Sequence, residues 1–180
     1  MKINLPNPPC DWKKGLHPEN LASLTEELKK VKKLAVLGVG SELMQDDRAG
    51  IDVTLYLEKK YSHNHPNVRI FTGYTTPENF TKAITDFNPE HIIIVDAADL
   101  KLTAGDFTDL PIERITDFSL GTHKLSLVMM IKFLKETINP NFSVLAIQYK
   151  SIDFGEKMTK EVKAGVKNIS AFLSDIIDSL

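Results

Sequence analysis

The sequence predicts an α/β fold in which a doubly wound, mainly parallel sheet carries helices on both faces. Short apolar runs that suit buried strands alternate along the chain with longer segments of helical periodicity. The clearest run, residues 92–95, is continuous and β-branched, which is typical of a strand covered on both faces. Such alternation favours helical crossovers between parallel strands. With 180 residues and no internal repeat, the chain fits a single main domain.

The expected elements follow from local apolar patterns. Strands are expected at 34–37, 68–71, 92–95 and 142–147, with two shorter strand-like pieces at 107–110 and 112–115 that could pair with each other. Helices are expected at 18–31, 46–61, 76–88, 124–138 and from 158 to the C-terminus. Residues 46–61 also alternate like a strand, but sixteen residues without a turn signal exceed a usual strand. We therefore interpret this segment as a helix.

The first 33 residues are expected to be an N-terminal lead-in and a peripheral helix, ahead of a single α/β domain at residues 34–180. Proline and polar residues dominate the lead-in, and Leu21, Leu24, Leu28 and Val31 then repeat at helical spacing. This apolar stripe is narrow, so we expect the helix to pack on the outside of the domain. Removal of residues 1–16 should then leave a folded protein.

Composition excludes several classes of function. Lys and Arg total 22 against 24 Asp and Glu, and a net charge of -2 gives no surplus for general nucleic-acid binding. Cys10 is the only cysteine, so no internal disulfide can form, which fits a reducing compartment. No apolar run reaches the length of a membrane span, and the N-terminus lacks the apolar centre of a signal peptide. We expect a soluble cytoplasmic protein with no nucleic-acid or membrane partner.

Three ionisable residues lie where a parallel sheet usually places its site, beyond the carboxyl ends of the strands. They are Asp47, Asp96 and His123. Taken singly, each has an ordinary structural explanation: a helix cap, a turn and a hydrogen-bonded histidine at the start of a helix. Taken together, two carboxylates and an imidazole from converging loops form a ligand set suited to a divalent first-row metal with open positions.

Other kinds of site are less well supported. Gly38 and Gly40 suggest a dinucleotide loop, but Leu43 stands where the third glycine belongs and Thr72 where an acidic residue is wanted. Ser41 lacks the glycine that follows the serine of a nucleophile elbow. Cys10 has no evident partner. A serine or cysteine acyl-enzyme is therefore disfavoured.

Several segments, in order, resemble motifs of the nickel–iron hydrogenase maturation proteases, in particular the hydrogenase-3 type. The glycine-rich GVGSELMQDDRAG resembles their opening motif, HIIIVDAAD their second motif and GTHKLSL their Thr-His segment, while VLAIQ fits their last strand. The similarity extends from about Leu34 to the C-terminus. Three motifs in the family's order are far more specific than any one of them.

The resemblance implies an endopeptidase that removes the C-terminal extension of a nickel-loaded hydrogenase large-subunit precursor. It places metal recognition on Asp47, Asp96 and His123, with the nickel carried by the substrate and weakly or not bound by the free enzyme. It identifies no catalytic residue: an aspartate could activate water, or the metal could polarise the scissile carbonyl. The alternative is a non-enzymatic nucleotide- or metal-binding module on the same scaffold.

The sequence also departs from the family pattern in three places. Ser41 replaces the usual asparagine, although both serve as turn residues. Thr72 stands where the family often has an aspartate at the end of the second strand, which puts any role of that carboxylate in doubt. The helix at 18–31 lies outside the family's usual start.

Overall fold

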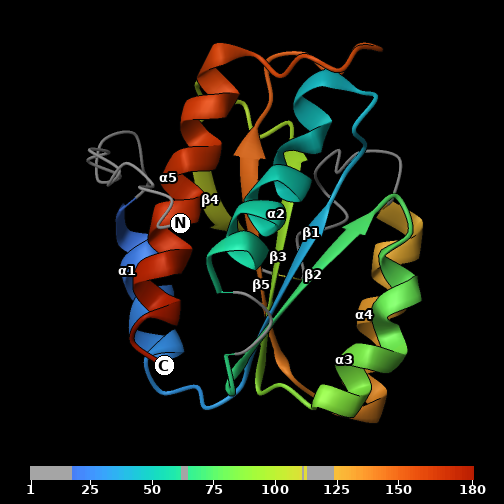
Figure 1. Ribbon diagram of the computed structural model, residues 1–180, viewed down its shortest axis with the longest axis vertical. Helices are drawn as coiled ribbons and strands as arrows, with labels where there is room; N and C mark the ends of the chain where they lie inside the picture. Colours follow the sequence, from blue (N-terminus) through green and yellow to red (C-terminus); the bar gives the residue numbers. More distant parts are fainter. Residues whose placement is uncertain (1–17, 62–64, 111, 113–123) are drawn as a thin grey trace, which may run out of the picture.

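The computed structural model describes residues 18–61, 65–110, 112 and 124–180, and these build one five-stranded sheet. Its strands are β1 (Leu34–Val39), β2 (Val68–Tyr74), β3 (His91–Ala98), β4 (Phe107–Leu110) and β5 (Asn141–Gln148). Their order is β2-β1-β3-β5-β4. The first four in this order are parallel, and β4 runs antiparallel at the edge (Figure 1). The predicted mainly parallel α/β fold is confirmed.

The helices of the described chain lie before, between and after these strands. They are α1 (Pro18–Leu28), the short 3-10 helix η1 (Gln45–Arg48), α2 (Ala49–Tyr61), η2 (Pro77–Phe80), α3 (Thr81–Phe87), α4 (Lys124–Thr137) and α5 (Lys160–Ile177). The helical interpretation of the ambiguous segment at 46–61 is therefore confirmed. The strand-like piece at 107–110 is β4, but it pairs with β5. The piece at 112–115 lies almost entirely outside the described residues.

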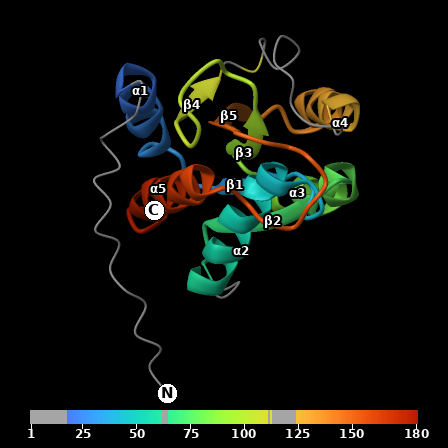
Figure 2. The ribbon, with the colours of Figure 1, turned by 90° about the horizontal axis from the view of Figure 1, so that it is seen from above.

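Each face of the sheet is covered by its own layer of helices. Alternate residues of the central strands point to opposite faces, so the apolar runs supply two separate cores. Seen from above, α1, α5 and α2 lie on one face, and α3 and α4 lie on the other (Figure 2). One core combines Val36, Ile93 and Leu145 with α1, α2 and α5, and the other combines Leu37 and Ile94 with α3 and α4.

The first helix buries the leucines of its narrow stripe in the core. Leu21, Leu24 and Leu28 are at most 2% exposed and belong to the same core as α5. Polar contacts add to this packing, because the side chain of Asn141 donates a hydrogen bond to Glu27 (3.2 Å). The helix packs through this stripe at the edge of its layer, and its neighbouring residues Glu26, Glu27 and Lys29 are exposed. The domain boundary at residue 33 stays a prediction.

Glycines allow α2 to approach the sheet very closely. A Cβ on Gly50 would stand 2.1 Å from the carbonyl oxygen of Val95, and a Cβ on Gly38 would stand 2.2 Å from the carbonyl oxygen of Gly50. Only glycine permits such contact between backbones. The first turn of α2 therefore lies directly against β1 and β3, and it fixes η1 above the carboxyl ends of these strands.

None of the helices in the described part of the chain has the length and apolar character needed to cross a membrane.

Candidate active site

Two buried carboxylic acids lie together at the carboxyl edge of the sheet. Asp47 is on η1, directly after the loop that follows β1, and Asp96 is on β3 near its end. Asp96 is 1% exposed and Asp47 is 4% exposed. The backbone N–H of Ala97 donates a hydrogen bond to Asp96 Oδ1 at 2.8 Å. The structure therefore brings together two of the three predicted site residues, from two different strand ends.

The environment of Asp96 opposes its ionisation. Burial raises the pKa of Asp96 well above its usual value, and the nearby carboxylate of Asp47 raises this pKa further. The hydrogen bond from Ala97 lowers the pKa of Asp96 and offsets only part of these effects. Two like charges in a buried site repel each other strongly. The pair can hold a proton or a cation between them more easily than it can remain doubly ionised.

The neighbouring Asp46 has a different role. Its carboxylate accepts hydrogen bonds from the backbone N–H groups of Lys150 (2.9 Å), Ser151 (3.0 Å) and Thr159 (2.7 Å), and from the Thr159 hydroxyl (3.0 Å). It thus fastens η1 to the loop between β5 and α5. The N-cap position of η1 is Met44, and Asp46 and Asp47 both lie in its first turn.

The glycine-rich loop packs closely against the backbone of η1. Gly40 has a φ of +140°, and a Cβ there would stand 1.8 Å from the carbonyl oxygen of Asp47. This glycine serves a close turn onto η1. Ser41 acts as a turn residue, since its hydroxyl accepts a hydrogen bond from the N–H of Leu43 at 3.4 Å. The backbone of η1 therefore occupies the space in which a phosphate would have to sit against Gly40.

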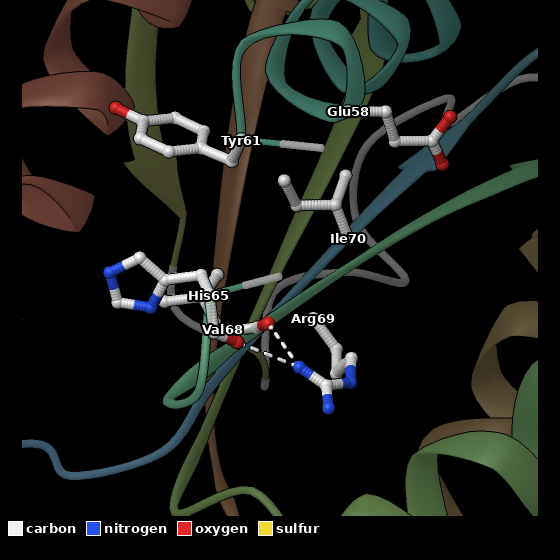
Figure 3. Close-up of a pocket in the computed structure, with 6 residues that line it drawn as sticks. All are labelled: Glu58, Tyr61, His65, Val68, Arg69 and Ile70. Atoms are coloured by element: carbon white, nitrogen blue, oxygen red, sulfur yellow. Dashed lines mark hydrogen bonds between the residues drawn. The ribbon is translucent and has the colours of Figure 1, made fainter. Parts of the chain in front are cut away.

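A small surface pocket lies at the opposite edge of the sheet. Side chains from the end of α2 and the start of β2 line it, and they include Tyr61, His65 and Arg69 (Figure 3). Arg69 Nη1 donates hydrogen bonds to the carbonyl oxygens of His65 (2.7 Å) and Val68 (3.0 Å). The arginine is thus used within the fold. Since α2 starts near Asp47 and runs to the amino end of β2, this pocket is remote from the aspartate pair.

Comparison with known proteins identifies the family of this chain. The sequence profile of the hydrogenase maturation proteases matches residues 51–175. The chain belongs to the hydrogenase maturation protease family. It is 35% identical over 162 residues to MJ0631 of Methanocaldococcus jannaschii, which is assigned to the same family, with 87% of this chain and 95% of that protein covered. The chain is therefore a peptidase.

Two further relatives support the assignment of this maturation protease. The hydrogenase 3 maturation protease of Escherichia coli is 33% identical over 135 residues, which cover 74% of this chain and 84% of that protein. The crystal structure of the maturation protease HycI from Thermococcus kodakarensis superposes with a TM-score of 0.78 and covers 87% of this chain and 99% of that chain. At 20% identity, this second likeness shows the shared fold.

The third predicted ligand of the maturation protease, His123, lies outside the described residues. The helix α4 begins at the next residue, Lys124. Among residues 18–61, 65–110, 112 and 124–180, no group of three histidines, cysteines or acids could hold a metal. The metal role of Asp47, Asp96 and His123 therefore stays a prediction, and the structure brings together the two carboxylates of the set.

At the position where the family often has an aspartate, this maturation protease places a buried hydroxyl. Thr72 Oγ1 is within hydrogen-bond distance of Thr54 Oγ1 (2.9 Å) and Glu58 Oε1 (3.1 Å). A carboxylate therefore does approach the end of β2, but it comes from α2. Sequence reasoning missed Glu58, because no spacing rule connects the last turn of a helix with the end of the following strand.

Proposed function

We propose that this maturation protease removes a C-terminal extension from a hydrogenase large-subunit precursor in the cytoplasm, and that it recognises the precursor's nickel through Asp47, Asp96 and His123. The observation that carries the proposal is the pair of buried carboxylic acids, Asp47 and Asp96, at the carboxyl edge of the sheet. The names of the relatives supply the substrate class, since the Escherichia coli relative is a hydrogenase 3 maturation protease.

The electrostatics of the pair suggest how nickel licenses cleavage. Without a cation, burial and the charge of Asp47 favour the protonated form of Asp96. A divalent ion brought by the precursor offsets the repulsion and displaces this proton, since carboxylates bind metal in their ionised form. Binding of the loaded precursor is thereby coupled to the ionisation of Asp96. A precursor without nickel does not drive the ionisation of Asp96, and it is bound without being cleaved.

The same chemistry makes the free enzyme a weak nickel binder. Protons compete with the metal for Asp96, and three ligands leave much of the coordination shell of a first-row ion to water or substrate groups. Two carboxylates and an imidazole also offer no thiolate that would compete for nickel with a cysteine-rich centre. The site can therefore sense the ion without removing it from the precursor.

The test is cleavage of nickel-loaded and nickel-free precursor, followed by measurement of product mass. The wild-type enzyme should process only the loaded form, and Asp47→Asn, Asp96→Asn and His123→Ala should each reduce the rate at least tenfold. Asp99→Asn is the matched control, because Asp99 follows β3 but pairs with Lys101 at the surface. Equal processing of both precursors by the wild type refutes the metal-reading mechanism.

The rival function is a nucleotide- or metal-binding module without catalysis. Its strongest sequence feature was the glycine-rich loop, and the space beside Gly40 is taken by the carbonyl of Asp47. Membership of a peptidase family also weighs against it. A titration of the protein with ATP and with NAD in the absence of nickel discriminates the two, because micromolar binding of either nucleotide supports the rival.

A further inference from the structure

Two loops are joined at the edge of the candidate active site, and each presents an apolar side chain. The N–H of Gly155 donates to the carbonyl of Leu43, and the N–H of Gln45 donates to the carbonyl of Gly155, each at 2.7 Å. These bonds form a parallel bridge between Met44 and Gly155. The residues that precede the bridge are Leu43 on one loop and Phe154 on the other.

The joined loops are also held in place by hydrogen bonds to Asp46. The Asp46 carboxylate binds Lys150 and Ser151 on one side of Phe154 and Thr159 on the other. The loop that carries Phe154 is therefore held at its start, at Gly155 and at its end. The backbone of such a loop has a fixed position, so binding to its side chains requires little ordering of the backbone.

Leu43 and Phe154 nevertheless face solvent. Phe154 is 80% exposed, and Leu43 is 52% exposed. Single exposed apolar residues are ordinary on protein surfaces. Here Leu43 and Phe154 lie on the same pair of joined loops, which we call the platform. Leu43 is only four residues before Asp47 in the sequence. The fold thus fixes an aromatic and an aliphatic side chain beside its site and does not bury them.

We infer that Leu43 and Phe154 form an exosite that positions the folded body of the protein substrate beside the Asp47–Asp96 pair. The inference rests on the proposed function, whose substrate is a protein. Aromatic residues, Phe among them, are enriched in protein–protein interfaces. Each platform residue directly follows an exposed acid, Glu42 or Asp153. The complementary surface is therefore an apolar patch of the precursor bordered by basic side chains.

The experiment compares the double variant Leu43→Ser/Phe154→Ser with Met129→Ser/Phe133→Ser, which alters two similarly exposed apolar residues on α4 (61% and 50%). Cleavage of nickel-loaded precursor should show KM raised roughly tenfold or more by the exosite variant, with kcat nearly unchanged. The α4 variant should keep the wild-type KM. Phe154→Ala should give part of the effect, and the Tm of each variant checks its folding.

Direct binding separates this inference from the proposed function. The affinity for intact precursor is measured for the wild type and the variants, with nickel-loaded and with nickel-free precursor. Altering the exosite should weaken the binding of both precursor forms equally, because the platform does not contact the metal. If wild type fails to cleave the precursor, the proposed function fails, and the binding series still tests the exosite. An exosite variant with wild-type KM and Kd overturns the inference.

Discussion

Thr159 donates two hydrogen bonds to the carboxylate of Asp46, one from its backbone N–H (2.7 Å) and one from its hydroxyl (3.0 Å). These residues are far apart in the sequence, and their contact connects the element that carries Asp47 to the start of the last helix. The two adjacent aspartates therefore have different roles. Asp46 holds the backbone together, and Asp47 meets Asp96.

This division predicts different effects of mutating the two acids. Asp46→Ala leaves four donors without their acceptor, so it should lower the free energy of unfolding by roughly 3–5 kcal/mol. The Tm should fall by about 2–4 °C for each kcal/mol. Thermal unfolding followed by circular dichroism measures the change. Asp153→Ala, on the same loop but exposed, should shift the Tm by less than about 2 °C.

Asp96→Asn should stabilise the protein, although we expect it to reduce the rate of cleavage. The folded-state pKa of Asp96 is raised, so its contribution to stability is complete below the unfolded pKa and is lost as the pH rises through the folded pKa. Asparagine carries no charge and keeps an oxygen for the Ala97 N–H. Denaturant unfolding at pH 7 should show a gain of about 1–3 kcal/mol that disappears near pH 3. A loss of stability at pH 7 would contradict the repulsion between Asp47 and Asp96.

A second buried acid gives a separate pH dependence. Asp109 on β4 has its pKa raised to about 7, mainly by burial, and Glu27 on α1 adds repulsion. Its Oδ1 atom has no hydrogen-bond partner in the described part of the chain. Ionisation of Asp109 in the folded protein therefore costs stability. His91 lies close by, since its Nε2 is 3.0 Å from Ser143 Oγ and its Nδ1 is 3.4 Å from Glu27.

We expect the wild type to lose stability relative to Asp109→Asn as the pH rises from about 4 to about 7, with no further change above the folded pKa. Partial solvent exposure limits the difference to the order of 1–2 kcal/mol. Urea unfolding of both proteins from pH 4 to 8 measures it. Parallel curves over this range would show that Asp109 has an ordinary pKa.

The burial of α1 predicts a contrast between two changes near the N-terminus. Leu24 is 2% exposed in the core shared with α5, so Leu24→Ala should cost about 2–5 kcal/mol. Deletion of residues 1–16 removes none of the buried leucines and should preserve cooperative thermal unfolding. If the deletion is as destabilising as Leu24→Ala, the lead-in contributes to the core.

Local patterns were sufficient to predict the elements of this protein. The β-branched run at 92–95 is the centre of β3, and the length of the segment at 46–61 correctly distinguished a helix from a strand. The position of Asp47 and Asp96 near the carboxyl edge of the sheet was predictable as well, because parallel strands end at one edge, although β3 continues past Asp96 to Ala98. The motifs also indicated the protease family that the comparisons show.

Other features depend on contacts between segments far apart in the chain, which no periodicity encodes. The sequence by itself determined the alternation of strands and helices, the two strand-end carboxylates and the family motifs, because these are local. Only the tertiary structure decided that β4 pairs with β5, that Asp46 binds Lys150, Ser151 and Thr159, and that Glu58 meets Thr72. It also decided the raised pKa of Asp96, since burial and a neighbouring charge exist only after the chain has folded.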